Sequence, residues 1–317
     1  MGDSCDLMLG FDIGGTKCAV VLGTIAGDVI GRVEVQTCDP GSTIDRLIEG
    51  GQALVGDQTV VACGVSCGSP LSRAEGLILS PPNMKQWVRV PIVSRIREQF
   101  HVPVNIENDA DAGALAEWRW GLNREVDDVV YLTCGTGQGS GLVLGGRLHR
   151  GVNNLAGEIG HVRLAAIGPV GCNKAGSVEG FTSGRALGEI AKLRLGEPHP
   201  TSLLDSIPID SVTGKDVGEA ALAGDTFAQS VVCEVGGYLG QACAIIVDLL
   251  NPGRISLGSL AVRLGDLIVE PVRAVVDREA MGPSAASCVI DAAALGDRVQ
   301  DLAALAVAGL VHPEAGE

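Results

Sequence analysis

Two copies of one short pattern constrain the fold of this chain more than any other feature. Each copy is an apolar run, a glycine-rich tip and a second apolar run: residues 7–23 with Gly14-Gly15-Thr16 at the tip, and 129–146 with Gly135-Thr136-Gly137. Alternating apolar residues predict strands, and the glycines predict a tight turn between them. The tips are 120 residues apart, which is about the length of one domain. The 317 residues therefore predict two related α/β domains.

Strand and helix patterns alternate around these hairpins. Short apolar runs predict further strands, at 29–35, 60–65, 104–106 and 254–257. Apolar residues at helical spacing predict helices at 44–55, 92–100, 108–118, 227–250 and 299–310. A polar stretch at 121–127 separates the two halves and is a candidate domain boundary.

Charge and composition exclude several classes of function. The net charge is −15, and such a field repels nucleic acid and anionic lipid. No uninterrupted apolar run approaches the roughly 18 to 20 residues of a membrane helix. The start of the chain lacks the basic and apolar segments of a secretion signal, and the ten cysteines are scattered without a CxxC pair. We therefore expect a cytoplasmic protein with reduced thiols and with neither nucleic acid nor membrane as a partner.

The glycine tips are suited to binding phosphate. Without Cβ atoms they bring backbone N–H groups close to an anion, and Thr16, Thr136 and Lys17 add donors and a positive charge. One such tip is equally well explained as a turn without a ligand, but two favour a polyphosphate held between domains. Neither tip leads straight into a helix, so neither is a P-loop or a dinucleotide fingerprint. Asp12 could hold phosphate-bound magnesium through water, or it could be a carboxylate exposed at a strand end.

Several motifs, in one order from residue 7 to about 310, resemble the ROK family (repressors, open reading frames, kinases) of the actin-like ATPase superfamily. Residues 11–17 and 132–146 resemble its two phosphate motifs. Glu107-Asn108-Asp109-Ala110 resembles the family's segment with the catalytic aspartate. Residues 157–161 resemble the family's sugar-binding signature. Asn251-Pro252, followed by residues 255–258, resembles the strand and turn near adenosine.

The resemblance implies a fold and a reaction. The fold is two actin-like (ribonuclease H-like) α/β domains with an interdomain cleft. Residues 1–119, with a C-terminal helix at about 299–317, would form the smaller domain, and 120–298 the larger. The reaction is transfer of the ATP γ-phosphoryl group to a hexose hydroxyl, most often at C6, with ATP and magnesium as cofactors. The family commonly forms homodimers or homotetramers.

The resemblance also assigns roles to residues. Asp109 would accept the proton of the attacking hydroxyl, since a carboxyl of ordinary pKa, about 4, is ionised at neutral pH. Alternatively, Asn108 or Asp109 only caps the following helix, or one of them does both. The sugar-binding residues implied are Asn83, Asn108, Glu158, His161 and Glu179. The nucleotide-binding residues implied are Gly14, Gly15, Thr16, Lys17, Gly135, Thr136, Gly137 and Gly258. Asp12 is implied at the magnesium ion.

Two departures from the family pattern concern the sugar and the zinc site, and a third is Ser259, which replaces the usual second glycine of the adenosine turn. Gly68-Ser69 stands where the family usually has Pro-Gly, so contacts to the sugar there are expected to be altered. The family's zinc motif has three cysteines besides its histidine, and the corresponding positions here are Val170, Cys172 and Ser177. A structural zinc site needs four ligands, and only His161 and Cys172 remain. We therefore expect no structural zinc.

The leading hypothesis is a cytoplasmic, glucokinase-like hexokinase. One alternative is a ROK repressor that senses a sugar. Such repressors carry a helical DNA-binding domain before the first phosphate motif. Only eleven residues precede Asp12 in this sequence, which disfavours the repressor. The other is a sugar-binding ROK protein that has lost catalysis, which the two departures favour. The sequence does not choose among glucose, mannose, fructose, allose and N-acetylated amino sugars.

Overall fold

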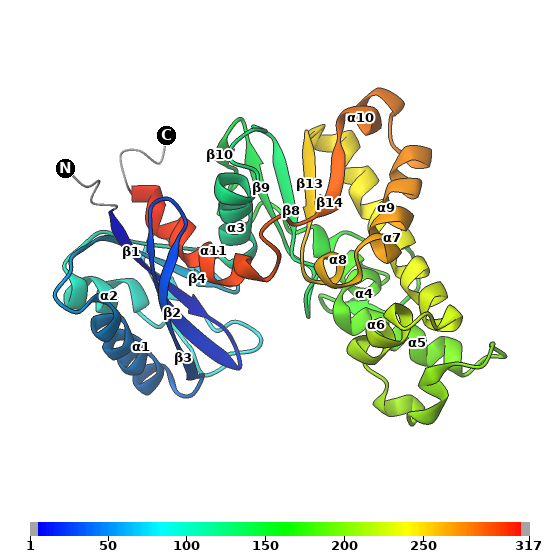
Figure 1. Cartoon of the computed structure of the whole chain (residues 1–317), viewed down its shortest axis with the longest axis horizontal. Helices are drawn as coiled ribbons and strands as arrows, with labels where there is room; N and C mark the ends of the chain where they lie inside the picture. Colours follow the sequence, from blue (N-terminus) through cyan, green and yellow to red (C-terminus); the bar gives the residue numbers. More distant parts are fainter. Residues whose placement is uncertain (1–5, 312–317) are drawn as a thin grey trace. The chain divides into compact units, whose positions relative to one another are not determined.

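The computed structural model describes residues 6–311 and divides them into two compact units (Figure 1). Unit 1 contains residues 6–125 and 297–311, and unit 2 contains residues 126–296. Each unit has a five-stranded mixed sheet with helices packed on it. This confirms the predicted α/β class with two actin-like domains. The outer ends of the expected domain ranges, 1–5 and 312–317, lie outside the described residues.

The sheet of unit 1 has the order β3-β2-β1-β4-β7. Its strands are β1 (Leu7–Ile13), β2 (Lys17–Thr24), β3 (Val29–Gln36), β4 (Val60–Cys67) and β7 (Val104–Asn108). Strands β1, β2 and β3 form an antiparallel meander, so the predicted hairpin with its glycine tip is confirmed. Strands β4 and β7 run parallel to β1. The short strands β5 (Leu71–Ser72) and β6 (Leu77–Ile78) form a separate ribbon.

Helices cover both faces of this sheet. Helices α1 (Pro40–Val55) and α2 (Ile92–Phe100) pack on one face, while α3 (Asp109–Ala116) and α11 (Val299–Ala308) pack together on the other side. Helix α11 (red in Figure 1) lies against β1 and β4. It approaches closely because these strands present glycines: a Cβ on Gly10 would lie 2.7 Å from the backbone nitrogen of Leu305, and one on Gly64 would collide with Ala304. The C-terminal segment is thereby built into unit 1.

Two helices depart from their predicted limits. Helix α1 begins at Pro40 rather than at 44, because Asp39 caps it by accepting the N–H of Ser42 and proline is favoured in a first turn. The helix predicted at 108–118 is α-helical to Ala116 and continues as a π-helix over Glu117–Gly121.

The sheet of unit 2 repeats the arrangement of unit 1, with the order β10-β9-β8-β13-β14. Its strands are β8 (Val129–Leu132), β9 (Ser140–Leu144), β10 (Arg147–Leu148), β13 (Arg254–Leu257) and β14 (Val289–Ala292). Strands β8 and β9 form the second predicted hairpin, and β13 and β14 run parallel to β8. A two-stranded ribbon consists of β11 (Val170–Gly171) and β12 (Lys174–Ala175). The repeated order explains the recurrence of the glycine-tip pattern in the sequence.

Seven helices complete unit 2: α4 (Val178–Thr182), α5 (Gly184–Leu195), α6 (Gly214–Leu222), α7 (Thr226–Leu250), α8 (Ser259–Leu264), α9 (Asp266–Glu279) and α10 (Gly282–Ser287). By length and composition alone, α7 is apolar enough to cross a membrane. However, 61% of its most apolar window is buried inside the protein, and Glu234 and Asp248 interrupt its sequence. Glycines 236 and 240 let α9 pack closely on it. Helix α7 is the central core helix of unit 2.

Candidate active site

Three functional segments of unit 1 meet at the carboxyl ends of its parallel strands. In the register of the sheet, Asp12 on β1 lies opposite Ser66 on β4, and Cys67 on β4 lies opposite Asn108 on β7. Parallel strands end at one edge of a sheet, which is where α/β folds place ligands. The fold therefore brings Asp12, the loop after Cys67 and Asp109 to the same edge.

Burial perturbs both aspartates, and the charge of Asp109 adds to the effect at Asp12. Burial, followed by the charges of Asp109 and Asp301, raises the pKa of Asp12 to about 7, although Arg32 and Lys17 act in the opposite direction. Desolvation also raises the pKa of Asp109, while a hydrogen bond from the backbone N–H of Ala110 opposes the rise. Asp109 is nevertheless exposed to solvent, so a substrate can reach it. Carboxylates that repel one another in this way favour a proton or a cation between them.

The donor set at this edge fits a cation that arrives with phosphate. The described residues contain no cluster of three or more histidine, cysteine, aspartate or glutamate side chains that could enclose a metal. Magnesium is commonly held by one or two carboxylates, with phosphate oxygens and water completing its shell. Asp12, together with Asp109, provides that kind of partial site.

Asn108 caps helix α3, as one of the sequence alternatives predicted. Its Oδ1 accepts the backbone N–H of Ala110 at 2.9 Å, and its Nδ2 donates to Ser69 Oγ at 2.8 Å. The Oδ1 of Asp109 accepts the same N–H of Ala110 at 2.9 Å. The other oxygen of Asp109, Oδ2, faces Gly68. A side chain at position 68 would place its Cβ 3.9 Å from this oxygen, whereas glycine leaves the space beside it open. Capping by Asn108 therefore leaves Asp109 available for chemistry.

The first glycine tip is fixed by Thr37, which follows β3. The Thr37 hydroxyl donates to the carbonyl oxygen of Gly14 at 2.7 Å, and its backbone N–H donates to the carbonyl of Thr16 at 3.0 Å. Thr16 and Lys17 are exposed. The Nζ of Lys17 is 3.0 Å from Glu34 Oε2, so part of its predicted positive charge is already neutralised within the protein. Sequence reasoning missed Thr37, whose only signal was its place between a strand and a helix cap.

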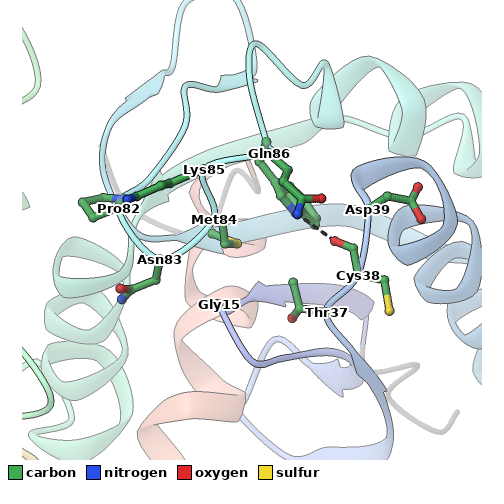
Figure 2. A pocket seen from close by; sticks show the side chains of 10 residues that line it. Gly15, Thr37, Cys38, Asp39, Pro82, Asn83, Met84, Lys85 and Gln86 are labelled. Carbon is green, nitrogen blue, oxygen red and sulfur yellow. Dashed lines mark hydrogen bonds between the residues drawn. The ribbon is translucent and has the colours of Figure 1, made fainter.

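A pocket of about 410 Å³ adjoins this tip (Figure 2). Figure 2 shows Asn83 on the opposite side of the pocket from Asp39, with Gly15 and Thr37 between them. The buried Trp87 anchors the wall, because its Nε1 donates to the carbonyl of Cys38 at 3.3 Å. A Cβ on Gly15 would lie 2.8 Å from the Cβ of Asn83, so the tip and the Asn83 loop are in close contact. The predicted sugar residue Asn83 thus adjoins the predicted phosphate tip.

The second glycine tip lies against the starts of two helices of unit 2. The N–H of Gly184, the first residue of α5, donates to the carbonyl of Gly135 at 2.7 Å, and the N–H of Leu260 in α8 donates to the carbonyl of Cys134 at 3.1 Å. Helix amino ends carry partial positive charge, which favours phosphate. Thr136 is exposed. A Cβ on Gly258 would lie 2.5 Å from the carbonyl oxygen of Thr133, so this turn requires glycine.

The predicted sugar residues of unit 2 lie on two short helices. Glu158 and His161 flank a 3₁₀ turn, with His161 Nε2 3.7 Å from Glu158 Oε2 and both side chains about half exposed. Glu179 lies on α4 and bridges two segments. Its Oε1 accepts the backbone N–H of Cys172 at 2.8 Å, and its Oε2 accepts that of Gln138 at 3.1 Å. Glu179 therefore links the β11–β12 ribbon to the second glycine tip, a role that the sequence did not indicate.

The sequence profile of the ROK family matches residues 8–309. The chain belongs to the ROK family. A glucokinase of Halalkalibacterium halodurans is 32% identical over 280 residues, which cover 84% of this chain and 83% of that protein. A crystal structure of a ROK family glucokinase from Streptomyces griseus in complex with glucose and AMPPNP is similar with a TM-score of 0.80 at 30% identity, covering 96% of this chain and 98% of that one. A xylose repressor of Caldicellulosiruptor bescii is 28% identical over 310 residues, or 95% of this chain and 77% of the repressor.

The zinc-motif positions of this ROK protein have other structural roles. Val170 has no donor atom, and the buried Ser177 caps α4, its Oγ accepting the N–H of Gly180 and donating to the carbonyl of Gly171. Burial, with the nearby charge of Glu179, raises the pKa of Cys172 to about 12 and keeps it a neutral thiol. With no donor at Val170 and with Ser177 engaged as a helix cap, the motif lacks the four ligands of a structural zinc site.

Side chains cross-link the ribbon instead. Lys174 Nζ donates to the carbonyl of His161 at 2.6 Å, Arg163 Nη1 to that of Ala175 at 2.7 Å, and Arg185 Nη2 to that of Val170 at 2.7 Å. These bonds tie both strands of the ribbon to the segments that carry His161 and α5. The ribbon of this ROK protein is thus held by cationic side chains on carbonyl oxygens.

Proposed function

We propose that this protein is a cytoplasmic ATP-dependent sugar kinase that transfers the γ-phosphoryl group of ATP to a hydroxyl of a hexose, at C6 of glucose or a related sugar. The observation that carries the proposal is the position of Asp109. It is exposed at the start of α3, at the sheet edge that also carries Asp12 and the first glycine tip. The kinship with glucokinases at about 32% identity supports it.

Asp109 acts as the proton acceptor. Phosphoryl transfer requires in-line positioning, neutralisation of phosphate charge and a base that orients the attacking hydroxyl. Desolvation raises the pKa of Asp109 and so makes it a stronger base than an ordinary aspartate. Because Asn108 provides the helix cap, the role of Asp109 need not be limited to capping α3.

Each glycine tip is a proposed phosphate-binding turn for the phosphoryl donor. Backbone N–H groups of Gly14, Gly15 and Gly137, with the hydroxyls of Thr16 and Thr136, are the proposed donors to phosphate oxygens. The N–H of Gly135 donates to the carbonyl of Gly137 at 3.1 Å, so Gly135 is proposed to contribute by shaping the tip. Asp12 is the proposed holder of magnesium, which supplies charge neutralisation at the phosphates when bound. The relative crystallised with AMPPNP supports ATP as the donor. The turn at Gly258 has no room for a side chain and is the proposed contact near adenosine.

The sugar is recognised by amide and carboxylate side chains, for which we propose Asn83, Asn108, Glu158, His161 and Glu179. Both oxygens of Glu179 already accept backbone N–H groups, and each has a second lone pair for a sugar hydroxyl. The backbone carbonyl of His161 accepts from Lys174, which holds the segment that carries His161 by a bond that requires no zinc. By family resemblance we also propose a homodimer or homotetramer.

A second candidate function is a sugar-binding ROK protein without catalysis. The altered zinc positions and the kinship with a xylose repressor favour it. A coupled ADP-release assay with a panel of hexoses and nucleotides separates the two. Kinase activity with one or more hexoses, at least about 10²-fold lower in Asp109→Asn, would support the proposal. Hexose binding without any phosphoryl transfer would establish the second candidate.

A further inference from the structure

Two contacts connect the loop after β4 to the two residues that precede Asp109. The loop, residues 68–84, begins at the sheet edge and ends with Asn83. Ser69 Oγ accepts a hydrogen bond from Asn108 Nδ2 at 2.8 Å, and Arg73 Nε lies 2.8 Å from Glu107 Oε1. Glu107 and Asn108 are the last two residues of β7. The loop is therefore attached at two neighbouring points of the strand that leads into the catalytic aspartate.

The ion pair compensates the charge of a buried carboxylate. The side chain of Glu107 is only 2% exposed, while that of Arg73 is 36% exposed and comes in from the surface. Removing one partner of a pair with a buried carboxylate leaves its charge uncompensated, which is strongly unfavourable. Arg89 and Glu75, in the same region, form a pair whose side chains are 62% and 55% exposed. Such a solvated pair contributes little, so it is a natural control.

The serine bond fixes the orientation of the Asn108 amide. Oδ1 of Asn108 caps α3 through Ala110, and Nδ2 is held by Ser69, so both ends of the amide are engaged. A glycine or an alanine at position 69 would have no hydroxyl to accept this bond. Ser69 therefore restrains a proposed sugar ligand in a way that glycine cannot.

We propose that Ser69 and Arg73 are positioning residues that hold the 68–84 loop and the Asn108 amide in register with Asp109, and thereby set the affinity for the sugar. This proposal rests on the proposed kinase function. Neither residue touches the reacting atoms, and both act through β7. Their loss raises KM for the hexose and leaves KM for ATP unchanged, because neither residue contacts the glycine tips through any described bond.

The test compares Ser69→Ala, Arg73→Met and Arg73→Lys with two controls from the same region, Arg89→Met and Ser94→Ala. Hexose KM should rise about five- to tenfold in Ser69→Ala and more in Arg73→Met, as expected for losing one hydrogen bond or one buried charge contact. Arg73→Lys should restore most of the loss, and the controls should stay within about twofold of wild type. A matching rise in KM for ATP, or an equal effect of Arg89→Met, would overturn the proposal.

A second measurement is independent of activity. Hydrogen–deuterium exchange of the unliganded protein should accelerate in residues 68–84 in Ser69→Ala and Arg73→Met, and should be unchanged there in the controls. Unchanged exchange in both variants would refute the attachment of the loop even if the protein is a kinase. If the wild type phosphorylates no hexose, the proposed function fails, while this exchange result still decides whether the two contacts hold the loop. Ser69→Ala keeps the test decisive if Arg73→Met does not fold.

Discussion

Replacing Asp12 by asparagine should make the protein more stable at neutral and basic pH. Burial and the charges of Asp109 and Asp301 raise the pKa of Asp12 from 3.8 to about 7. Its ionised form is therefore disfavoured in the folded state relative to the unfolded chain, where the carboxyl is surrounded by water. Asparagine has nearly the same shape but carries no charge, so Asp12→Asn removes this penalty.

The size of the effect follows from the pKa change. A shift of about 3 units at about 1.36 kcal/mol per unit sets an upper limit of about 4 kcal/mol. Asp12 keeps partial contact with solvent, so we expect about 2–4 kcal/mol. The folded state holds the proton more tightly than the unfolded state. The Asp12 contribution to the free energy of unfolding therefore falls as pH rises from about 4 to about 7 and is constant above that.

Urea unfolding of both proteins at several pH values between 4.5 and 8, in EDTA, measures this difference. The variant should exceed the wild type by the full amount at pH 8, and the difference should shrink steadily toward pH 4.5. Asp57→Asn, an exposed aspartate on the loop after α1, is the matched control and should change stability little at any pH. A variant that is less stable than wild type at pH 8, or a difference independent of pH, would refute the reasoning.

Three further predictions concern catalysis, nucleotide binding and zinc. Asp109→Asn should lower kcat about 10²-fold or more with little change in either KM, and turnover within a few-fold of wild type would show that Asp109 is not the proton acceptor. Gly258→Ala should raise KM for ATP and destabilise the fold, because its Cβ would lie 2.5 Å from a carbonyl oxygen. Gly237→Ala, on α7 with free space around it, should instead stabilise the protein by about 0.5–1 kcal/mol. Equal effects of the two substitutions on stability would contradict the packing argument. Elemental analysis of protein purified without chelator should find less than stoichiometric zinc, and one tightly held ion per chain would overturn this expectation.

The sequence alone predicted both hairpins and most strands of the two sheets, but it predicted neither β14 nor the order of the strands. Alternation of apolar residues and the placement of glycine are local signals, because side-chain direction in a strand and access to a tight turn depend on neighbours only a few positions away. The hairpins at Gly14-Gly15 and Gly135-Thr136-Gly137 and the strand over Arg254–Leu257 are therefore found where the patterns predict them. The position of Asn108 before a helical pattern also predicted that Asn108 or Asp109 caps the helix, and Asn108 does so.

Only the tertiary structure decided how the site residues are engaged. The hydrogen bond between Asn108 and Ser69 joins residues 39 positions apart, and the bond between Gln138 and Glu179 joins residues 41 positions apart. No local sequence pattern predicts either bond. The pKa of Asp12 depends on Asp301, which arrives on α11 from the far end of the chain. Partners, burial and protonation are properties of groups that meet only when distant segments pack, because desolvation and hydrogen bonding depend on distance in space rather than on separation in sequence.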